Sequence, residues 1–162
     1  LYGQSKRLGE VVAPNFLNIR CSIIGPDPAK KKGLLEWLRS RPPGSEVPGF
    51  QNHVWNGVTT LQFAQLCSAL IVHGSFDPVR NESPIHHFCP NRPVSKFELL
   101  NILQSAFGVL VKIKPVSQGD QPVKRLLNTR FSSLKEIYHH DRPMETAIAE
   151  LASLQIKSVA AK

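Results

Sequence analysis

Two residues near the start of the sequence, Tyr2 and Lys6, have the types and spacing of an acid–base pair. They lie four positions apart in YGQSKRLGEVV, so on a helix both side chains leave the same face about one turn apart. A neighbouring ammonium favours the phenolate of a tyrosine and lowers its pKa from the usual value of about 10. Proton transfer near neutral pH then becomes feasible. Such pairs also arise by chance on exposed helices, so the surrounding elements must decide between the two interpretations.

The residues around this pair predict a helix followed by a buried strand. Leu8, Val11 and Val12 have the spacing of an inward face on a helix over residues 2–12. Residues 15–25 carry apolar side chains at both odd and even positions, which is typical of a strand buried on both faces in a parallel sheet. Such a strand needs neighbours on both sides. We therefore expect the first half of the sheet to lie upstream of Leu1.

Capping boxes predict where three further helices begin. They pair Thr59 with Gln62, Ser95 with Glu98, and Ser133 with Glu136. Two more helices are expected over residues 33–40 and 143–154, and two strands over residues 85–89 and 109–114, the second ending at Pro115. Strands that alternate with helices in this way indicate the α/β class.

The order of these segments resembles that of a known enzyme family. YGQSK, then RLGEVV, NIRCSIIG and Pro26 resemble the active-site helix, the following strand and the nicotinamide-facing loop of the extended short-chain dehydrogenase/reductases. NHVWNGVTTLQFAQLCSALI, IHHFCPNRPVSKFELLNILQSAFG and PVKRLLNT resemble the second half of its sugar-nucleotide members, nearest to the dTDP-4-dehydrorhamnose reductases. The resemblance spans the chain from Tyr2 to about Leu154.

The resemblance implies the C-terminal part of a Rossmann-type NAD(P)-binding domain with a smaller α/β substrate domain. Residues 1–27 would be the end of the Rossmann domain, with the YxxxK helix, a strand and the loop beside the nicotinamide. Residues 28–162 would form mainly the substrate domain, with residues 60–90 returning to the Rossmann sheet.

The activity implied by the resemblance is reduction of a nucleotide-activated 4-keto-6-deoxysugar by NAD(P)H, in nucleotide-sugar metabolism and polysaccharide biosynthesis. Tyr2 would be the proton donor, and Lys6 would bind the nicotinamide ribose and lower the tyrosine pKa. The loop beside the nicotinamide would consist of Ile23, Ile24, Gly25 and Pro26. On the substrate side, the matching positions are Arg20, Asn56 and Arg125, whose guanidinium could bind a diphosphate. Trp55 joins them as a loop residue that could contact substrate.

Two departures from the family pattern leave alternatives open. Ile23 stands where the dehydrorhamnose reductases place a tryptophan in the sugar site, so the sugar is undecided. The sequence contains no GxxGxxG or GxGxxG motif, and the family's catalytic Ser or Thr comes earlier in the chain, so we expect this part alone to bind the dinucleotide poorly and not to turn over. An epimerase or dehydratase of the same family, or a non-catalytic sugar-nucleotide-binding or regulatory homologue, is the alternative.

Composition disfavours several other classes of protein. The formal net charge is +8, but aromatic residues make up only 7% and the basic residues are scattered, so a nucleic-acid partner is not expected. His86 and His87 are adjacent and would point to opposite faces of a strand, so no metal site is expected. Three cysteines without a CxxC pair, no signal peptide and no apolar run of about 20 residues favour a cytoplasmic protein without a membrane partner. The expected partner is a nucleotide sugar, and a homodimer stays open.

Overall fold

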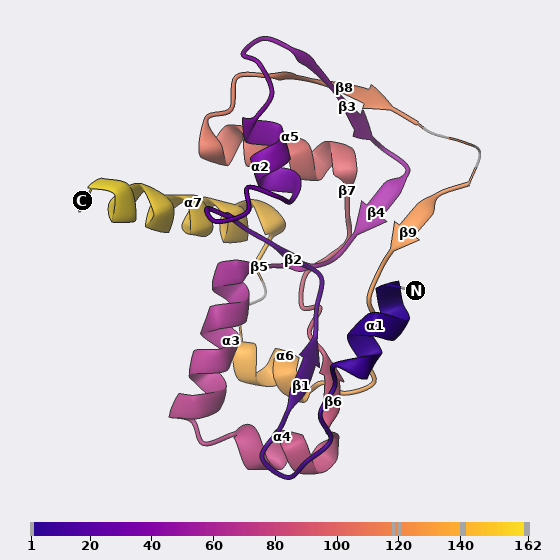
Figure 1. The fold of residues 1–162 in the computed structure, drawn as a ribbon, viewed down its shortest axis with the longest axis vertical. Coiled ribbons are helices and arrows are strands. Elements are labelled where there is room, and N and C mark those ends of the chain that lie inside the picture. The colour runs from indigo at the N-terminus through magenta and orange to yellow at the C-terminus, as the bar shows by residue number, and fades with distance from the viewer. Residues whose placement is uncertain (1, 118, 120, 140–141, 161–162) are drawn as a thin grey trace.

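The computed structural model describes residues 2–117, 119, 121–139 and 142–160, without the side chains of residues 2 and 155–160. The helices are α1 Tyr2–Leu8, α2 Leu34–Arg39, α3 Thr60–Val72, α4 Phe76–Glu82, α5 Lys96–Phe107, α6 Ser133–Tyr138 and α7 Met144–Ala160. The strands are β1 Asn18–Arg20, β2 Ile23–Ile24, β3 Glu46–Phe50, β4 His53–Trp55, β5 Val58–Thr59, β6 Ile85–His87, β7 Val94–Ser95, β8 Lys112–Val116 and β9 Val123–Arg125. The expected mixed α/β class is confirmed (Figure 1).

The strands pair mostly in parallel and form small sheets. β1 pairs with β6, β2 with β5 and β3 with β8, all in parallel. β4 lies between β7, which is antiparallel to it, and β9, which is parallel to it. Because parallel strands need a crossover between them, at least one helix separates the partners in the sequence: α2 lies between β2 and β5, and α3 lies between the partners of the other parallel pairs.

The single strand predicted over residues 15–25 is wrong. The chain forms β1 and β2 instead, and these pair with different strands. At the break, the carbonyl of Ser22 accepts a hydrogen bond from the Val58 N–H at 2.8 Å, so the backbone leaves β6 and joins β5. Burial on both faces is wrong as well, since β1 is half-buried and Ile23 is 50% exposed.

Two apolar clusters hold the elements together. One surrounds α5 and includes Leu38 of α2, Val47 of β3 and Ile148 of α7. The other surrounds α3 and includes Phe88 and Tyr138, whose rings meet edge to face at 5.3 Å. In Figure 1 the first cluster corresponds to the upper half of the molecule and the second to the lower half.

Residues 60–90 end in a strand that lies beside β1, and their expected return to the Rossmann sheet stays a prediction. They form α3, α4 and β6, and β6 is the strand that pairs with β1. The proposed division into domains at residue 27 stays a prediction.

Two of the three expected capping boxes are confirmed. The hydroxyls of Thr59 and Ser95 accept hydrogen bonds from the third residues of α3 and α5, whose side chains accept from the cap N–H groups in return. Gly108, at φ 62°, ends α5 in the left-handed conformation, as expected. The third box is wrong because α6 has Ser132 as its cap residue and no side-chain capping bond.

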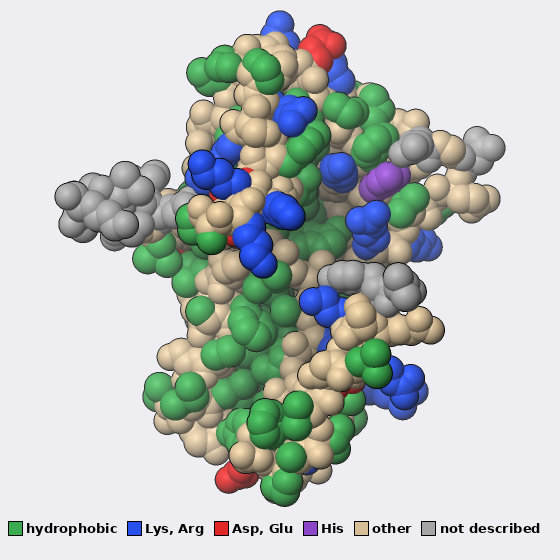
Figure 2. Space-filling view, in the orientation of Figure 1, with side chains coloured by type: hydrophobic (Ala, Val, Ile, Leu, Met, Phe, Trp, Pro, Cys, Tyr) green, Lys and Arg blue, Asp and Glu red, His purple; other side chains and the backbone are tan. Residues whose placement is uncertain are grey.

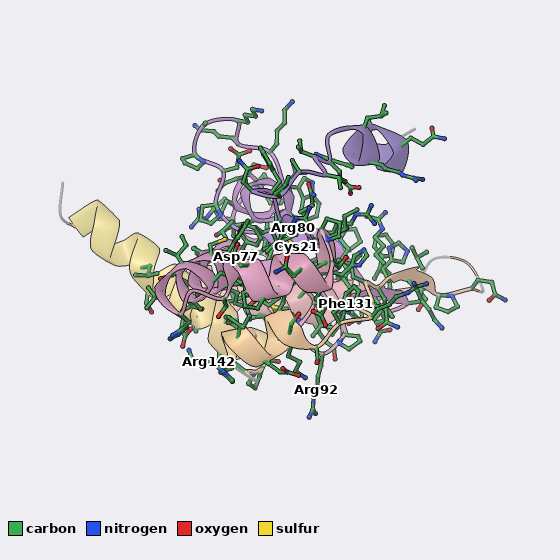
Figure 3. All side chains as sticks on the ribbon, turned by 90° about the horizontal axis from the view of Figure 1, so that it is seen from below. Cys21, Asp77, Arg80, Arg92, Phe131 and Arg142 are labelled. Carbon is green, nitrogen blue, oxygen red and sulfur yellow. The ribbon has the colours of Figure 1, made fainter. Side chains whose placement is uncertain are left out.

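The first helix is shorter and more exposed than its pattern predicts. α1 ends at Leu8, and the expected inward face is wrong because Leu8 is 88% and Val12 is 68% exposed. α1 lies at the edge of the molecule in two perpendicular views (Figures 1 and 3). The segment after it is anchored by Arg80, labelled in Figure 3, whose guanidinium donates to the Ala13 carbonyl at 3.0 and 3.2 Å.

Strand β8 has the expected solvent-exposed face but ends later in the sequence than predicted. Val111 beside it is buried, while Lys112 and Lys114 are exposed. The expected end at Pro115 is wrong, since β8 continues to Val116. Among the described strands β8 pairs with β3 only, and an edge strand tolerates a proline because one side of its backbone donates no ladder bond. Within the described part of the chain, no helix has both the length and the apolar character needed to cross a membrane.

Candidate functional site

A candidate site is a cavity of about 570 Å³ beyond the carboxyl end of β2. It is lined by residues 22–27, 32–34 and 53–55, with Phe50, Thr60, Lys96, Leu99 and Arg125. These residues belong to β2 and the loop after it, the start of α2, the end of β3, β4, the starts of α3 and α5, and β9. In sheets with parallel strands, ligands bind outside the carboxyl ends of the strands, so the position suits a ligand site.

Close packing fixes the loop after β2 against α3. A Cβ placed on Gly25 would lie 2.6 Å from Thr60 Cγ2 and would also overlap Thr60 Oγ1. Only glycine permits this approach, which brings the loop backbone to the cavity wall. The expected nicotinamide-side residues Ile23, Ile24, Gly25 and Pro26 therefore line the cavity together.

Aromatic side chains form one wall of the cavity. The indole Nε1 of Trp55 donates a hydrogen bond to Ser22 Oγ at 2.6 Å, which fixes the ring plane. The rings of Phe50 and His53 stack with centroids 4.5 Å apart and planes 18° apart. Such a wall can pack against the flat faces of a nucleobase or a sugar ring.

Three cationic side chains, from Lys32, Lys96 and Arg125, line the same cavity. The pKa of Lys96 is lowered because burial removes water from its ammonium, and the charge of Arg125 lowers it further. Lys and Arg side chains gather over the middle of the face seen in Figure 2, with few acidic side chains beside them. The cavity therefore suits an anionic ligand.

Asp27 is the carboxylate among the described lining residues, and its hydrogen bonds are to the backbone of its own loop. One oxygen accepts from the Lys30 N–H at 3.0 Å and the other from the Lys32 N–H at 3.3 Å. These backbone bonds, with the nearby lysine charges, lower the pKa of Asp27. The carboxylate thus holds the loop that presents Lys32.

Two expected substrate residues have other contacts, and neither is among the described residues that line the cavity. The Arg20 guanidinium forms two hydrogen bonds to the Glu10 carboxylate, at 2.6 and 2.8 Å, and this pairing lowers the pKa of Glu10. Asn56 is buried, and its side chain exchanges hydrogen bonds of 2.9 Å with the backbone N–H and carbonyl of Leu127. Both residues stay predictions as ligand contacts.

The expected catalytic pair lies on α1. The Tyr2 side chain is outside the described residues, so its position is not part of the site geometry. Lys6 is exposed on α1 and is not among the described residues that line the cavity. The roles of both residues stay predictions.

Lys32, Phe50, His53 and Lys96 are among the lining residues that the sequence interpretation did not assign to the site. A signal existed for His53, which stands two positions from Trp55 and so shares its strand face. For Lys96 the capping box placed the residue at the first turn of α5, but nothing in the sequence indicated that this turn faces the cavity. Within the described part of the chain, no group of three His, Cys, Asp or Glu side chains is arranged to hold a metal ion.

Comparisons with solved structures identify the fold. A dTDP-4-dehydrorhamnose reductase from Clostridium acetobutylicum has a TM-score of 0.64 and 16% identity, over 95% of this chain and 55% of its own. Another from Yersinia enterocolitica has a TM-score of 0.54 and 14% identity, over 85% and 48%. A dTDP-glucose 4,6-dehydratase from Bacillus anthracis, solved in complex with NAD, has a TM-score of 0.52 and 16% identity, over 86% and 44%.

The chain shares the fold of these enzymes. It spans about half the length of the solved structures it matches. No protein-family model and no curated protein matches the sequence. The expected fold class, mixed α/β with parallel strands as in Rossmann-type reductases and dehydratases, is therefore confirmed.

Proposed function

We propose that this chain is the substrate-binding and proton-donating part of an NAD(P)H-dependent reductase of a nucleotide-activated 4-keto-6-deoxysugar. The observation that carries the proposal is the cavity itself. It combines an aromatic wall, three cations and the loop of residues 23–26 in the fold of dTDP-sugar enzymes. A sugar nucleotide offers a base, a sugar and a diphosphate, which match these three features.

The residues present fit the nicotinamide end of the cofactor. Ile23 is 50% exposed and lies at the cavity with Gly25, whose backbone can approach a ring closely because no side chain intervenes. NAD(P)H, when bound, supplies a hydride to the carbonyl carbon. Tyr2 would give the carbonyl oxygen a proton from its phenol, and the ammonium of Lys6 would stabilise the resulting phenolate.

A dehydratase or epimerase is the second candidate, because one of the matching structures is a dTDP-glucose 4,6-dehydratase. Those reactions would use the same tyrosine and lysine but return the hydride to the sugar. A non-catalytic sugar-nucleotide binder is the third candidate, since the cavity can bind a ligand whether or not α1 takes part in chemistry.

A Tyr2→Phe variant separates the enzyme from the binder. In a protein that carries this chain, we expect the change to abolish NAD(P)H oxidation with a 4-keto sugar nucleotide while sugar-nucleotide affinity stays the same. The reason is that phenylalanine keeps the ring but has no proton to give. Nicotinamide absorbance measures turnover, and calorimetry measures affinity.

The controls identify the reaction class. Phe16→Tyr, which adds a phenol on a half-exposed side chain outside the cavity lining, should leave turnover unchanged. Net consumption of NAD(P)H supports the reductase, whereas product formation without net consumption supports the epimerase or dehydratase. If the wild-type protein binds sugar nucleotides but converts none of them to a product, the enzyme proposal fails.

A further inference from the structure

A second cavity, of about 460 Å³, lies beside strand β6 and shares no described lining residue with the first. One side is formed by Ser83, Ile85 and His87, and the other by residues 128–131, which precede α6. We call it the β6 cavity. Its volume is in the range of small-molecule sites, and the proposed function assigns no role to it.

Hydrogen bonds fix the shape of the segment over residues 128–131. Thr129 Oγ1 donates to the Phe131 carbonyl at 2.9 Å and accepts the Phe131 N–H at 3.2 Å. Asn128 Oδ1 accepts the Thr129 N–H at 3.0 Å. This side of the β6 cavity is therefore formed before any ligand binds.

The buried ring of His86 connects the two sides of the β6 cavity. Its Nε2–H donates to the carbonyls of Val79 and Ser83, at 3.0 and 3.1 Å. The ring of Phe131, labelled in Figure 3, lies against the imidazole with centroids 4.8 Å apart and planes 47° apart. Because Ser83 and Phe131 both line the β6 cavity, one buried side chain holds its two sides in place.

Arg130 brings a positive charge to the β6 cavity without an acidic partner. Its side chain is exposed and takes part in none of the ion pairs between described residues. None of the described lining residues is acidic. The carboxylate of Glu10, whose charge acts on His87, is already bonded twice to the guanidinium of Arg20. The β6 cavity therefore favours an anion.

The other lining groups combine neutral polar atoms with apolar surface. Burial lowers the pKa of His87 and the charge of Arg20 lowers it further, so its imidazole is uncharged near pH 7 and can still form a hydrogen bond. Asn128 Nδ2 makes no hydrogen bond to the described residues and can donate to a ligand. Ile85 and the ring of Phe131 supply apolar contact area. Together these groups match a flat anion with an apolar body.

We propose that the β6 cavity is a second binding site, for a small aromatic monocarboxylate, in which Arg130 binds the carboxylate and Phe131 contacts the ring. A planar carboxylate matches the two parallel N–H groups of a guanidinium. An aromatic body can pack on the phenylalanine ring. The inference does not depend on the proposed function, because the two cavities have no described lining residue in common.

The test is an NMR titration of the whole protein that carries this chain, with benzoate, benzamide, acetate and inorganic phosphate as probes. We expect benzoate to bind most tightly, because it alone combines the carboxylate with the ring. Benzamide has the same shape without the charge, and acetate has the charge without the ring. If phosphate or acetate binds as tightly as benzoate, the cavity attracts anions in general and the inference is overturned.

Two arginine variants assign the charge. For Arg130→Met we expect about a tenfold loss of benzoate affinity and little change for benzamide. Arg92→Met is the matched control, because Arg92 is also exposed, belongs to no ion pair between described residues and is not among the described lining residues of either cavity (Figure 3). It should leave the benzoate affinity unchanged, and an equal loss in both variants would contradict the proposal.

A further variant and a local probe make the result independent of one substitution. Asn128→Asp keeps the oxygen that accepts the Thr129 N–H but adds a negative charge to the lining, so benzoate affinity should fall at least as far as in Arg130→Met. Benzoate should also raise the pKa of His87, because a nearby anion favours the imidazolium. His73, exposed at the end of α3 and not among the described lining residues, should show no change on adding benzoate. A wild type that binds no benzoate, or a benzoate affinity that neither variant alters, would overturn the inference and leave the proposed function untouched.

Discussion

The ammonium of Lys96 is placed where its environment disfavours its own charge. Burial and the neighbouring Arg125 lower its pKa, while the rings of Trp37 and Phe50 favour the cation. An anion in the cavity would stabilise the charged form, so ligand binding and protonation of this lysine are coupled.

This coupling predicts a pH dependence of ligand affinity. Binding of thymidine diphosphate should be constant while Lys96 is protonated and should weaken as pH rises through its pKa. Because that pKa is lowered, the decline should begin below the usual lysine value of about 10.4. Calorimetry across the alkaline range, on the wild type and on Lys96→Arg, measures the effect.

The arginine variant corrects for titration of the ligand itself, since a guanidinium keeps its charge over this range. The difference between the two proteins isolates the lysine. Parallel affinity curves for the wild type and Lys96→Arg would contradict the coupling.

Gly25 sets the shape of the cavity wall by having no side chain. A Gly25→Ala variant should lose about 1–3 kcal/mol of unfolding free energy, because its Cβ overlaps the Thr60 side chain at the start of α3. Urea unfolding followed by circular dichroism measures the loss. The ligand affinity should fall with it, since the loop must move away from α3.

A second substitution tests the cause. Thr60→Ala removes both overlapping atoms and leaves only its Cβ, 3.0 Å from the methyl carbon that alanine adds at position 25, so the double variant should recover most of the lost stability. A double variant as unstable as Gly25→Ala alone would mean that the loop is strained for another reason.

At the scale of elements, a pair of buried amides joins α3 to the segment after β6. Gln62 Nε2 donates to Asn91 Oδ1 at 2.9 Å, and Asn91 Nδ2 donates to Gln62 Oε1 at 3.0 Å. Gln62 Oε1 also accepts the Thr59 N–H, and Asn91 Nδ2 also donates to the Gly57 carbonyl at 2.7 Å. Gln62, a residue of the capping box, thus also binds the segment after β6.

Removing half of this pair leaves buried polar atoms without partners. We expect Gln62→Leu to lower the unfolding free energy by about 2 kcal/mol, because Asn91 Oδ1 and the Thr59 N–H each lose a hydrogen bond while buried. Chemical unfolding of Gln62→Leu, Asn91→Leu and the double variant forms a cycle that measures the coupling. Strictly additive losses would show that the two amides do not cooperate.

The sequence was informative where local chemistry decides structure. The boxes at Thr59 and Ser95 and the terminating Gly108 were predictable because a cap depends on residues three or four positions apart. The box at Ser133 failed because α6 begins one residue earlier than its pattern suggests, with Ser132 as the cap residue.

Long-range contacts explain what the sequence could not show. The apolar pattern over residues 15–25 predicts one strand, yet the segment forms two strands because its first part pairs with β6 and its second part with β5. Among the site residues, the loop of residues 23–26, Trp55 and Arg125 were predicted and share one cavity. Lys96 was missed because its place in the cavity depends on how α5 packs against β3, β4 and β8, which no local pattern encodes.

At the scale of the whole molecule, the cavity is bordered by elements of both apolar clusters. Leu99 and Trp55 belong to or pack against the cluster around α5, and Thr60 begins α3, which the other cluster surrounds. A ligand in the cavity would therefore contact both halves of the fold at once. The unfolding free energy of each half and the affinity for the ligand should therefore change in the same direction.

Ser22 joins the strand break to the aromatic wall. Its carbonyl receives the Val58 N–H, and its hydroxyl receives the Trp55 indole N–H. The hydrogen bond to Ser22, whose backbone is itself bonded to Val58, thus holds the indole of Trp55 in place before a ligand binds. Less conformational entropy is then lost on association, so more of the contact energy appears as affinity.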